Sequence, residues 1–321
     1  MYEQFYELNE RPFDLTPNPK YLFLTPSHRE ALSSLEYGIA AGIGVTVLVG
    51  DAGTGKTTVI RATLDSSKRG KTKAVYLNNP TLTRSEFLEF LAREFGLGVE
   101  LAASKTRLLE ALEQVLRRTH ADGVSTALIV DEAQSLPHEL LEEIRLLANI
   151  ETPSVKLLPI VLAGQPELAD RLNHPSLRQL KQRVGLRCLL KPLTVSETGQ
   201  YITARVTVAG GKASTLFTRE AVLLIHERAK GIPRTTSVIC HNALIGGFAL
   251  NRRPVTADIV REVCRDFDFD APDELLPTMT ADGFRVVPID PSLRAAPGEV
   301  SRAETEKSGA RGVWRRFLSR A

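Results

Sequence analysis

Two short stretches of this chain carry residues that could do chemistry together. In GDAGTGKT, residues 50–57, glycines precede a lysine and a threonine. In TALIVDE, residues 126–132, an apolar run ends in two adjacent carboxylates, Asp131 and Glu132. Two like charges at the end of a buried strand repel each other and cost desolvation free energy. A cation that offsets this cost is therefore expected beside them.

The first stretch matches GxxxxGK[ST], a phosphate-binding pattern when it follows a strand and opens a helix. Here it follows the apolar, β-branched run 45–50, and a helical pattern begins at Gly55. Glycines let backbone N–H groups wrap phosphates, and the helix N-terminus adds its positive dipole end. The stretch therefore predicts an ATP site, in which Lys56 neutralises the β and γ oxygens. The predicted site residues are Gly50, Asp51, Ala52, Gly53, Thr54, Gly55, Lys56, Thr57 and Thr58.

The acidic pair, Asp131 and Glu132, predicts a Mg²⁺ site and a catalytic base. In sheets that carry a phosphate loop of this kind, an acidic residue at the end of a neighbouring strand holds Mg²⁺, usually through water. Asp131 and the Thr57 hydroxyl are the predicted Mg²⁺ ligands, and Mg²⁺ and Lys56 supply the charge that offsets the burial of Asp131. Glu132 points elsewhere and can orient or deprotonate a water aligned with the γ-phosphate, which predicts hydrolysis. The alternative is that Glu132 only caps the following segment.

Five short apolar runs alternate with helical patterns through residue 192. Continuous apolar strands that alternate with helices are typical of a parallel sheet buried on both faces. We therefore predict an α/β domain over 27–192, with a five-stranded parallel sheet flanked by helices. Its first helix can be capped by Thr25 with Pro26 at the first position, or by Ser27 in a capping box with Glu30. The predicted strands are 45–50, 73–78, 126–131, 156–164 and 184–190, and helices cover about 83–95 and 104–120.

The flanking segments differ from this domain. Residues 1–26 are rich in proline and aromatics without a pattern of regular structure, and the aromatics indicate that the segment packs against something. Residues 193–269 predict an all-helical domain, with helices over 194–209, 217–229, 233–249 and 255–265.

Two segments follow the helical domain. Residues 270–310 are punctuated by proline and glycine, which predicts a disordered linker. Residues 311–321, RGVWRRFLSRA, form a short basic amphipathic segment. Such a segment can contact a membrane surface or dock into a partner's groove, or it is a frayed terminus.

Composition excludes several classes of protein. The 321 residues are 43% hydrophobic and carry a net charge of +3, too small to indicate nucleic acid binding by itself. The cysteines, Cys188, Cys240 and Cys264, lack metal-binding spacing and fit a reducing cytosol. The N-terminus is not a signal peptide, and no apolar run approaches the ~20 residues of a membrane span. We expect a cytoplasmic protein.

The phosphate loop, the acidic pair, the five strands and the C-terminal helices together resemble an AAA+ ATPase. The resemblance implies a P-loop AAA+ core with a C-terminal helical lid, the cofactors ATP and Mg²⁺, and a homo-oligomer, either a ring or a filament. It implies that Gln165, after the fourth strand, lies between the acidic pair and the γ-phosphate, although Asn, Ser or Thr is more usual there. It also implies that Arg183, with Arg178 as the alternative, reaches a neighbouring subunit's nucleotide. Arg234, in KGIPRTTS, would reach the γ-phosphate from the lid.

More narrowly, the chain resembles the ExeA-type subgroup, which is related to the TniB, MuB and TnsC transposition ATPases. The shared features are the aromatic-rich segment Met1–Leu24 and the stretches DEAQ, AGQPEL and GIPR. The resemblance implies an accessory or assembly factor for secretion, pilus or exopolysaccharide export, acting on a protein client at the inner membrane. Full-length members continue into a membrane span and a peptidoglycan-binding region, and this sequence contains neither, so a periplasmic role is not expected.

Two other functions stay open. A DNA-binding AAA+ regulator of the transposition type would need basic loops on the core, such as SSKRGKTK at 66–73, which we interpret first as a solvated loop. DNA is not favoured as a partner, because the tail after Phe269 has too little apolar pattern for a winged-helix domain. A nucleotide-gated scaffold would bind ATP and hydrolyse it too slowly to matter.

Overall fold

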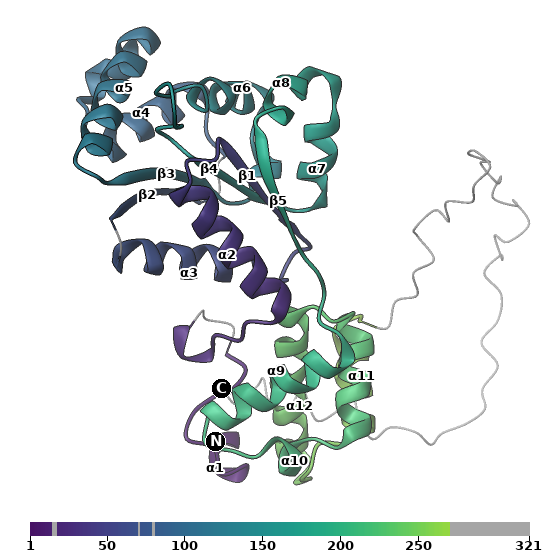
Figure 1. The fold of residues 1–321 in the computed structure, drawn as a ribbon. Coiled ribbons are helices and arrows are strands. Elements are labelled where there is room, and N and C mark those ends of the chain that lie inside the picture. The colour runs from purple at the N-terminus through teal and green to yellow at the C-terminus, as the bar shows by residue number, and fades with distance from the viewer. Residues whose placement is uncertain (15–17, 70, 79–80, 270–321) are drawn as a thin grey trace, which may run out of the picture. The chain divides into compact units, whose positions relative to one another are not determined.

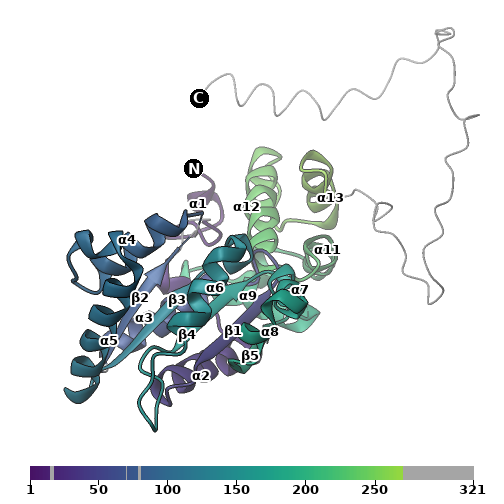
Figure 2. The ribbon, with the colours of Figure 1, turned by 90° about the horizontal axis from the view of Figure 1, so that it is seen from above.

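The computed structural model describes residues 1–14, 18–69, 71–78 and 81–269 (Figures 1 and 2). The predicted linker 270–310 and the basic segment 311–321 lie outside these residues. Among the described helices, none combines the length and the apolar character needed to cross a bilayer.

Five parallel strands form the predicted sheet, which is confirmed, in the order β2-β3-β4-β1-β5. Because β4 lies between β1 and β3, the ends of these three strands bring residues 50–57, Gln165 and Asp131 to one edge. The three strands are buried almost throughout, since helices cover both faces. The strands are β1 (Val45–Gly50), β2 (Thr72–Leu77), β3 (Ser125–Val130), β4 (Ile160–Gly164) and β5 (Val184–Leu190).

Helices α2 and α3 cover one face of the sheet, and α4 to α8 cover the other (Figure 1). Successive strand side chains point to opposite faces, so that Leu48 of β1 packs on the α2 side and Val47 on the other. Of the two capping schemes for α2, the structure has Thr25 as the N-cap, with Pro26 in the first turn. The helices are α2 (Pro26–Ala40), α3 (Lys56–Arg69), α4 (Arg84–Glu94), α5 (Lys105–Ala121), α6 (His138–Leu147), α7 (Pro166–Asn173) and α8 (Arg178–Lys181).

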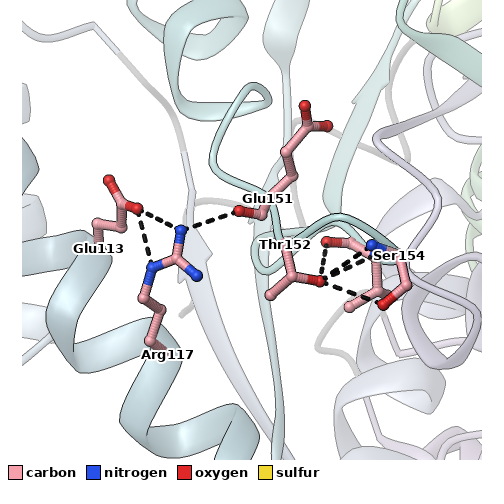
Figure 3. Close-up of polar contacts among 6 residues, drawn as sticks. Glu113, Arg117, Glu151, Thr152 and Ser154 are labelled. Carbon is pink, nitrogen blue, oxygen red and sulfur yellow. Dashed lines mark hydrogen bonds and ion pairs between the residues drawn. The ribbon is translucent and has the colours of Figure 1, made fainter.

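The fourth strand is shorter than predicted, because β4 begins only at Ile160. Residues 151–156 form a turn before it (Figure 3). Lys156 of the predicted strand pairs there with Glu151, and the N–H of Leu157 donates to the Ile150 carbonyl at 3.0 Å. The N–H of Thr152 donates to the Val155 carbonyl at 2.9 Å, and its hydroxyl accepts from the N–H of Val155 at 3.1 Å. Arg117 of α5 donates to the first carbonyl of the turn at 3.1 Å. These contacts fold residues 156 and 157 back on residues 150 and 151, and an apolar pattern does not show them, so it predicted too long a strand.

The basic cluster 66–73 is not the loop that the sequence analysis expected. Helix α3 continues through its first half to Arg69, and β2 begins at Thr72. A serine inside a helix can direct its hydroxyl to the carbonyl one turn back, without taking the place of the helical backbone bonds. Ser67 does so, donating to the Thr63 carbonyl at 2.8 Å. The loop interpretation is wrong for residues 66–69.

The C-terminal part of the described chain consists of helices around a core of their own. Ile202, Ile225, Ile239 and Val260 lie in this core. A small helix, α10, was not predicted. The helices are α9 (Val195–Val208), α10 (Ala213–Leu216), α11 (Arg219–Ala229), α12 (Pro233–Ala249) and α13 (Ala257–Asp266).

The N-terminal aromatics join this second core, so their predicted packing is confirmed: Tyr6 and Phe13 are fully buried there. The Tyr6 hydroxyl donates to the Arg252 carbonyl at 3.3 Å. The prediction of no regular structure is wrong for the one-turn helix α1 (Tyr2–Phe5) and the 3-10 turn Pro19–Tyr21. A helix this short is not stable alone, so the tertiary packing accounts for it.

Candidate nucleotide-binding site

The loop between β1 and α3 forms a cradle of backbone groups. Gly53 and Gly55 have φ angles of +80° and +104°, which other residues rarely adopt. Thr54 closes the loop, because its N–H and its hydroxyl donate to the Asp51 carbonyl at 3.2 and 2.8 Å. The two glycines therefore meet a conformational requirement of the predicted phosphate loop.

Lys56 provides a buried positive charge at this cradle. Its side chain is 4% exposed, and its ammonium donates to the carbonyl of Gly50 at 2.8 Å. Burial lowers the pKa of Lys56, while the nearby carboxylates of Glu132 and Asp131 act in the opposite direction. The sequence predicted that Lys56 offsets the cost of burying the acidic pair. The effect is mutual, because the two carboxylates also stabilise the buried ammonium.

Asp131 follows β3 and is 1% exposed. One of its oxygens, Oδ2, accepts hydrogen bonds from the Thr57 hydroxyl at 2.8 Å and the Tyr76 hydroxyl at 3.2 Å. The other, Oδ1, accepts from the N–H of Glu132 at 2.9 Å. Three donors therefore compensate the burial of this carboxylate. Thr57 and Asp131 also present adjacent oxygen atoms, the ligand type that Mg²⁺ prefers.

The backbone changes direction at Glu132, directly after Asp131 and the end of β3. It has φ +53° and ψ +37°, a left-handed conformation that is uncommon for a residue with a side chain. Its carboxylate accepts a hydrogen bond from the side-chain amide of Gln134 at 2.6 Å. Strain of this kind persists where the surrounding structure holds it, often at a functional site. The backbone turn thus separates the directions of the two adjacent carboxylates.

Gln134 also connects Glu132 to the end of β4. Its side-chain carbonyl accepts from the backbone N–H of Gln165 at 3.1 Å, and its backbone carbonyl accepts from Arg171 of α7. A Cβ at Gly164 would lie 2.7 Å from the Gln134 side-chain oxygen, so the close approach requires glycine there. Gln165 is the N-cap of α7 and is joined to Glu132 through Gln134.

A cavity of about 790 Å³ lies over the loop. Residues 52–58, Glu132 and Arg234 all line it, together with Tyr21, Leu193 and other residues of the N-terminal segment and the C-terminal helices. Arg234 lies in the first turn of α12, as predicted, and its N–H donates to the Gly53 carbonyl at 3.4 Å. A Cβ at Gly53 would lie 2.8 Å from the Arg234 Cβ. The cavity thus brings these predicted site residues together.

Two predicted arginines lie elsewhere. Among the described residues, the lining of this cavity includes neither Arg183 nor Arg178. Arg183 is exposed after α8 and lines a separate recess of about 310 Å³ with Arg145, Gln179 and Gln182. Arg178 is exposed at the start of α8. Neither arginine belongs to the cavity that holds Lys56 and Glu132.

Sequence reasoning missed three side chains that contact the predicted site: Tyr76, Gln134 and His28. Burial, followed by the charge of Asp131, raises the pKa of Tyr76 to about 12, so its hydroxyl is a donor at neutral pH. Gln134 lies within DEAQ, and a polar residue two positions after Glu132 was the available signal. His28 donates to the phosphate loop from the first turn of α2, with no signal except a histidine near a helix start.

Comparison with known proteins is consistent with this geometry. Residues 40–172 match the family model described as the AAA domain. General secretion pathway protein A of Aeromonas hydrophila is 42% identical over 249 residues, which are 78% of this chain and 45% of that protein. The chain therefore spans less than half the length of this relative.

Solved structures share the fold at lower identity. The ORC2 protein of Aeropyrum pernix, in its ADPNP-ADP complexes, is 18% identical with a TM-score of 0.60, covering 83% of this chain and 73% of that one. Drosophila ORC bound to DNA is 21% identical with a TM-score of 0.62, covering 84% of this chain and 66% of that one. At these identities the similarity establishes the fold.

Proposed function

Because the chain belongs to the AAA+ ATPases and is related to general secretion pathway protein A, we propose that it hydrolyses Mg-ATP in the cavity over residues 50–57. One observation carries the proposal: Lys56, Thr57 and Glu132 line the cavity together, and the Thr57 hydroxyl bonds to the buried carboxylate of Asp131. The cavity volume is also in the range of small-molecule sites.

Thr57 and Asp131 fit a Mg²⁺ site shared with the nucleotide. Their oxygens are 2.8 Å apart and chemically suited to this ion. Within the described residues no group of three or more His, Cys, Asp or Glu could hold a metal, so the phosphates would complete the ligand set. The ion would supply positive charge at the phosphate oxygens. Lys56 adds the charge of its ammonium, and the loop N–H groups bind the same oxygens.

Glu132 is the proposed base. Its carboxylate borders the cavity and would orient or deprotonate the water that attacks the γ-phosphate. Gln134 fixes this carboxylate by its 2.6 Å hydrogen bond and would thereby set the position of the water. Gln165 would act through Gln134, whose side-chain oxygen accepts a hydrogen bond from the backbone N–H of Gln165. Arg234 would reach the γ-phosphate from α12 and couple the C-terminal helices to the state of the nucleotide.

Arg183 is the proposed trans residue of a homo-oligomer. An arginine that approaches developing phosphate charge raises the hydrolysis rate by orders of magnitude. Arg183 is exposed in a recess apart from the cavity of its own chain, which suits a contact with a neighbouring copy. The recess also contains Arg145, whose guanidinium pairs with Glu142 at 2.7 Å.

The cellular role is proposed from the relative. We infer that hydrolysis supports the assembly of a secretion, pilus or exopolysaccharide export system, with a protein client at the cytoplasmic face of the inner membrane. The name of that relative, general secretion pathway protein A, supports the secretion part of this role.

Replacing Glu132 by Gln removes the base but keeps a side chain of similar size that can still bond to Gln134. We expect single-turnover hydrolysis to slow by about 10²–10⁴-fold, with ATP affinity changed less than threefold. Quenched-flow measurement of product, paired with equilibrium binding, checks both. Lys56→Ala is the matched control that should lose ATP binding itself. Equal single-turnover rates for wild type and Glu132→Gln would exclude this base and favour the scaffold function.

Replacing Gln134 by Leu removes both amide hydrogen bonds at nearly constant volume. The Glu132 carboxylate then loses a fixed partner, so we expect kcat to fall about tenfold while the Kd for ATP is unchanged. Gln114, on the surface helix α5, offers a control as Gln114→Leu, which should keep the wild-type rate. A loss of ATP affinity equal to the loss of rate would assign Gln134 to binding instead.

Replacing Arg183 by Ala should lower the multiple-turnover rate by about 10³-fold without preventing ATP binding. Mixing Arg183→Ala with Glu132→Gln should restore part of the activity, because Glu132 of one chain then meets Arg183 of another. Arg178→Ala, tested in the same mixture, examines the alternative trans residue. A wild-type rate per subunit that does not change with protein concentration across the assembly range would contradict the trans role.

Cells that carry Glu132→Gln in place of the wild-type chain should lose export while keeping a normal amount of the variant, since the export role requires hydrolysis. The measurement is the amount of secreted protein and polymer in the medium. Undiminished export, in cells whose purified variant hydrolyses no ATP, would contradict the export role and leave the ATPase assignment intact.

A further inference from the structure

A histidine from outside the phosphate loop holds one of its peptide groups. His28, in the first turn of α2, is 3% exposed, and its Nε2 lies 2.9 Å from the Thr54 carbonyl oxygen. Its Nδ1 lies 2.6 Å from the hydroxyl of Thr25, the N-cap of the same helix. Both ring nitrogens therefore have a partner, and one partner is the backbone of the loop.

The protonation of this ring follows from its surroundings. Burial lowers the pKa of His28, and a cation is disfavoured at a helix N-terminus. The imidazole is therefore neutral at pH 7, with one donor and one acceptor nitrogen. Because a carbonyl can only accept, Nε2 carries the hydrogen and donates to Thr54. Nδ1 then accepts from the Thr25 hydroxyl, which fixes the tautomer and the ring orientation.

The bond to Thr54 also determines where the next N–H points. A trans peptide is planar, and its C=O and N–H point in opposite directions. With the Thr54 carbonyl directed at His28, the N–H of Gly55 points away from the imidazole, and both residues of this peptide line the cavity. Gly55 has φ +104°, and a Cβ there would lie 2.7 Å from His28 Nε2. The missing side chain permits the close approach, but glycine also leaves this peptide free to rotate.

We propose that His28 is a positioning residue that fixes the Thr54–Gly55 peptide, so that the loop presents its N–H groups to a triphosphate before the ligand arrives. This inference rests on the proposed function of the cavity. Since binding then requires no reorientation of the peptide, the affinity for the phosphate chain is higher. Thr25 extends the connection to the start of α2.

The test compares His28→Leu with His28→Gln. The Leu variant leaves the buried Thr54 carbonyl without its donor, so the Kd for a non-hydrolysable ATP analogue should rise about tenfold. It should rise by a similar factor for inorganic triphosphate, because the effect acts on the phosphate chain. A Gln side chain can donate to Thr54 and accept from Thr25, so the Gln variant should recover most of the affinity. Equilibrium binding without added Mg²⁺ measures all three.

His226→Leu is the matched control, because its ring also bonds to a threonine hydroxyl, that of Thr198 at 2.8 Å, but outside the cavity lining. It should bind like the wild type. Wild-type affinity in His28→Leu would overturn the inference, as would a loss for the ATP analogue without a loss for triphosphate, which would place His28 against the base or sugar. Failure of Gln to recover affinity in a variant with wild-type melting temperature would also overturn it. A wild-type chain that binds no triphosphate would contradict the proposed function instead.

Discussion

A buried ammonium and a buried carboxylate share the edge of the sheet where β1 and β3 end, and the site depends on their balance. Lys56 and Asp131 are 4% and 1% exposed, so neither charge would be tolerated there without compensation. The charge of Asp131 favours the ammonium form of Lys56, so removal of either charge weakens the compensation of the other. Backbone carbonyls hold the lysine, and the hydroxyls of Thr57 and Tyr76 hold the carboxylate. The polar contacts at this edge therefore have a structural role as well as a chemical one.

Charge balance also matters where three helices begin beside the phosphate loop. The N-termini of α2, α3 and α12 contribute His28, Lys56 and Arg234 to the cavity lining. Each helix start carries the positive end of a dipole, so without an anion their convergence with two cationic side chains would be unfavourable. The carboxylate of Glu132 meets part of this need. A polyphosphate would meet much more of it, and this arrangement accounts for an arginine in the first turn of α12.

How far the sequence predicts the structure depends on the range of the interactions. Residues 50–57 were predictable because one contiguous stretch contains the glycines, the lysine and the helix start. The five strands were predictable because burial on both faces makes them continuously apolar. Gln134 and His28 were not, since the first depends on a left-handed backbone at Glu132 and the second on a contact 26 positions along the chain. The start of β4 and the helix α1 were also predicted wrongly, because a turn before β4 and the tertiary packing of the N-terminal segment decide them.

The position of Arg183 in the fold determines which nucleotide it can reach. Its carbonyl accepts from the N–H of Val45, so it lies where β1 begins. The phosphate loop lies where β1 ends, after a strand of six residues. At a rise of about 3.3 Å per residue the two ends are roughly 17 Å apart, farther than an arginine side chain extends. If Arg183 meets a phosphate in the proposed reaction, that phosphate belongs to another chain, and the parallel sheet itself separates the two halves of the site.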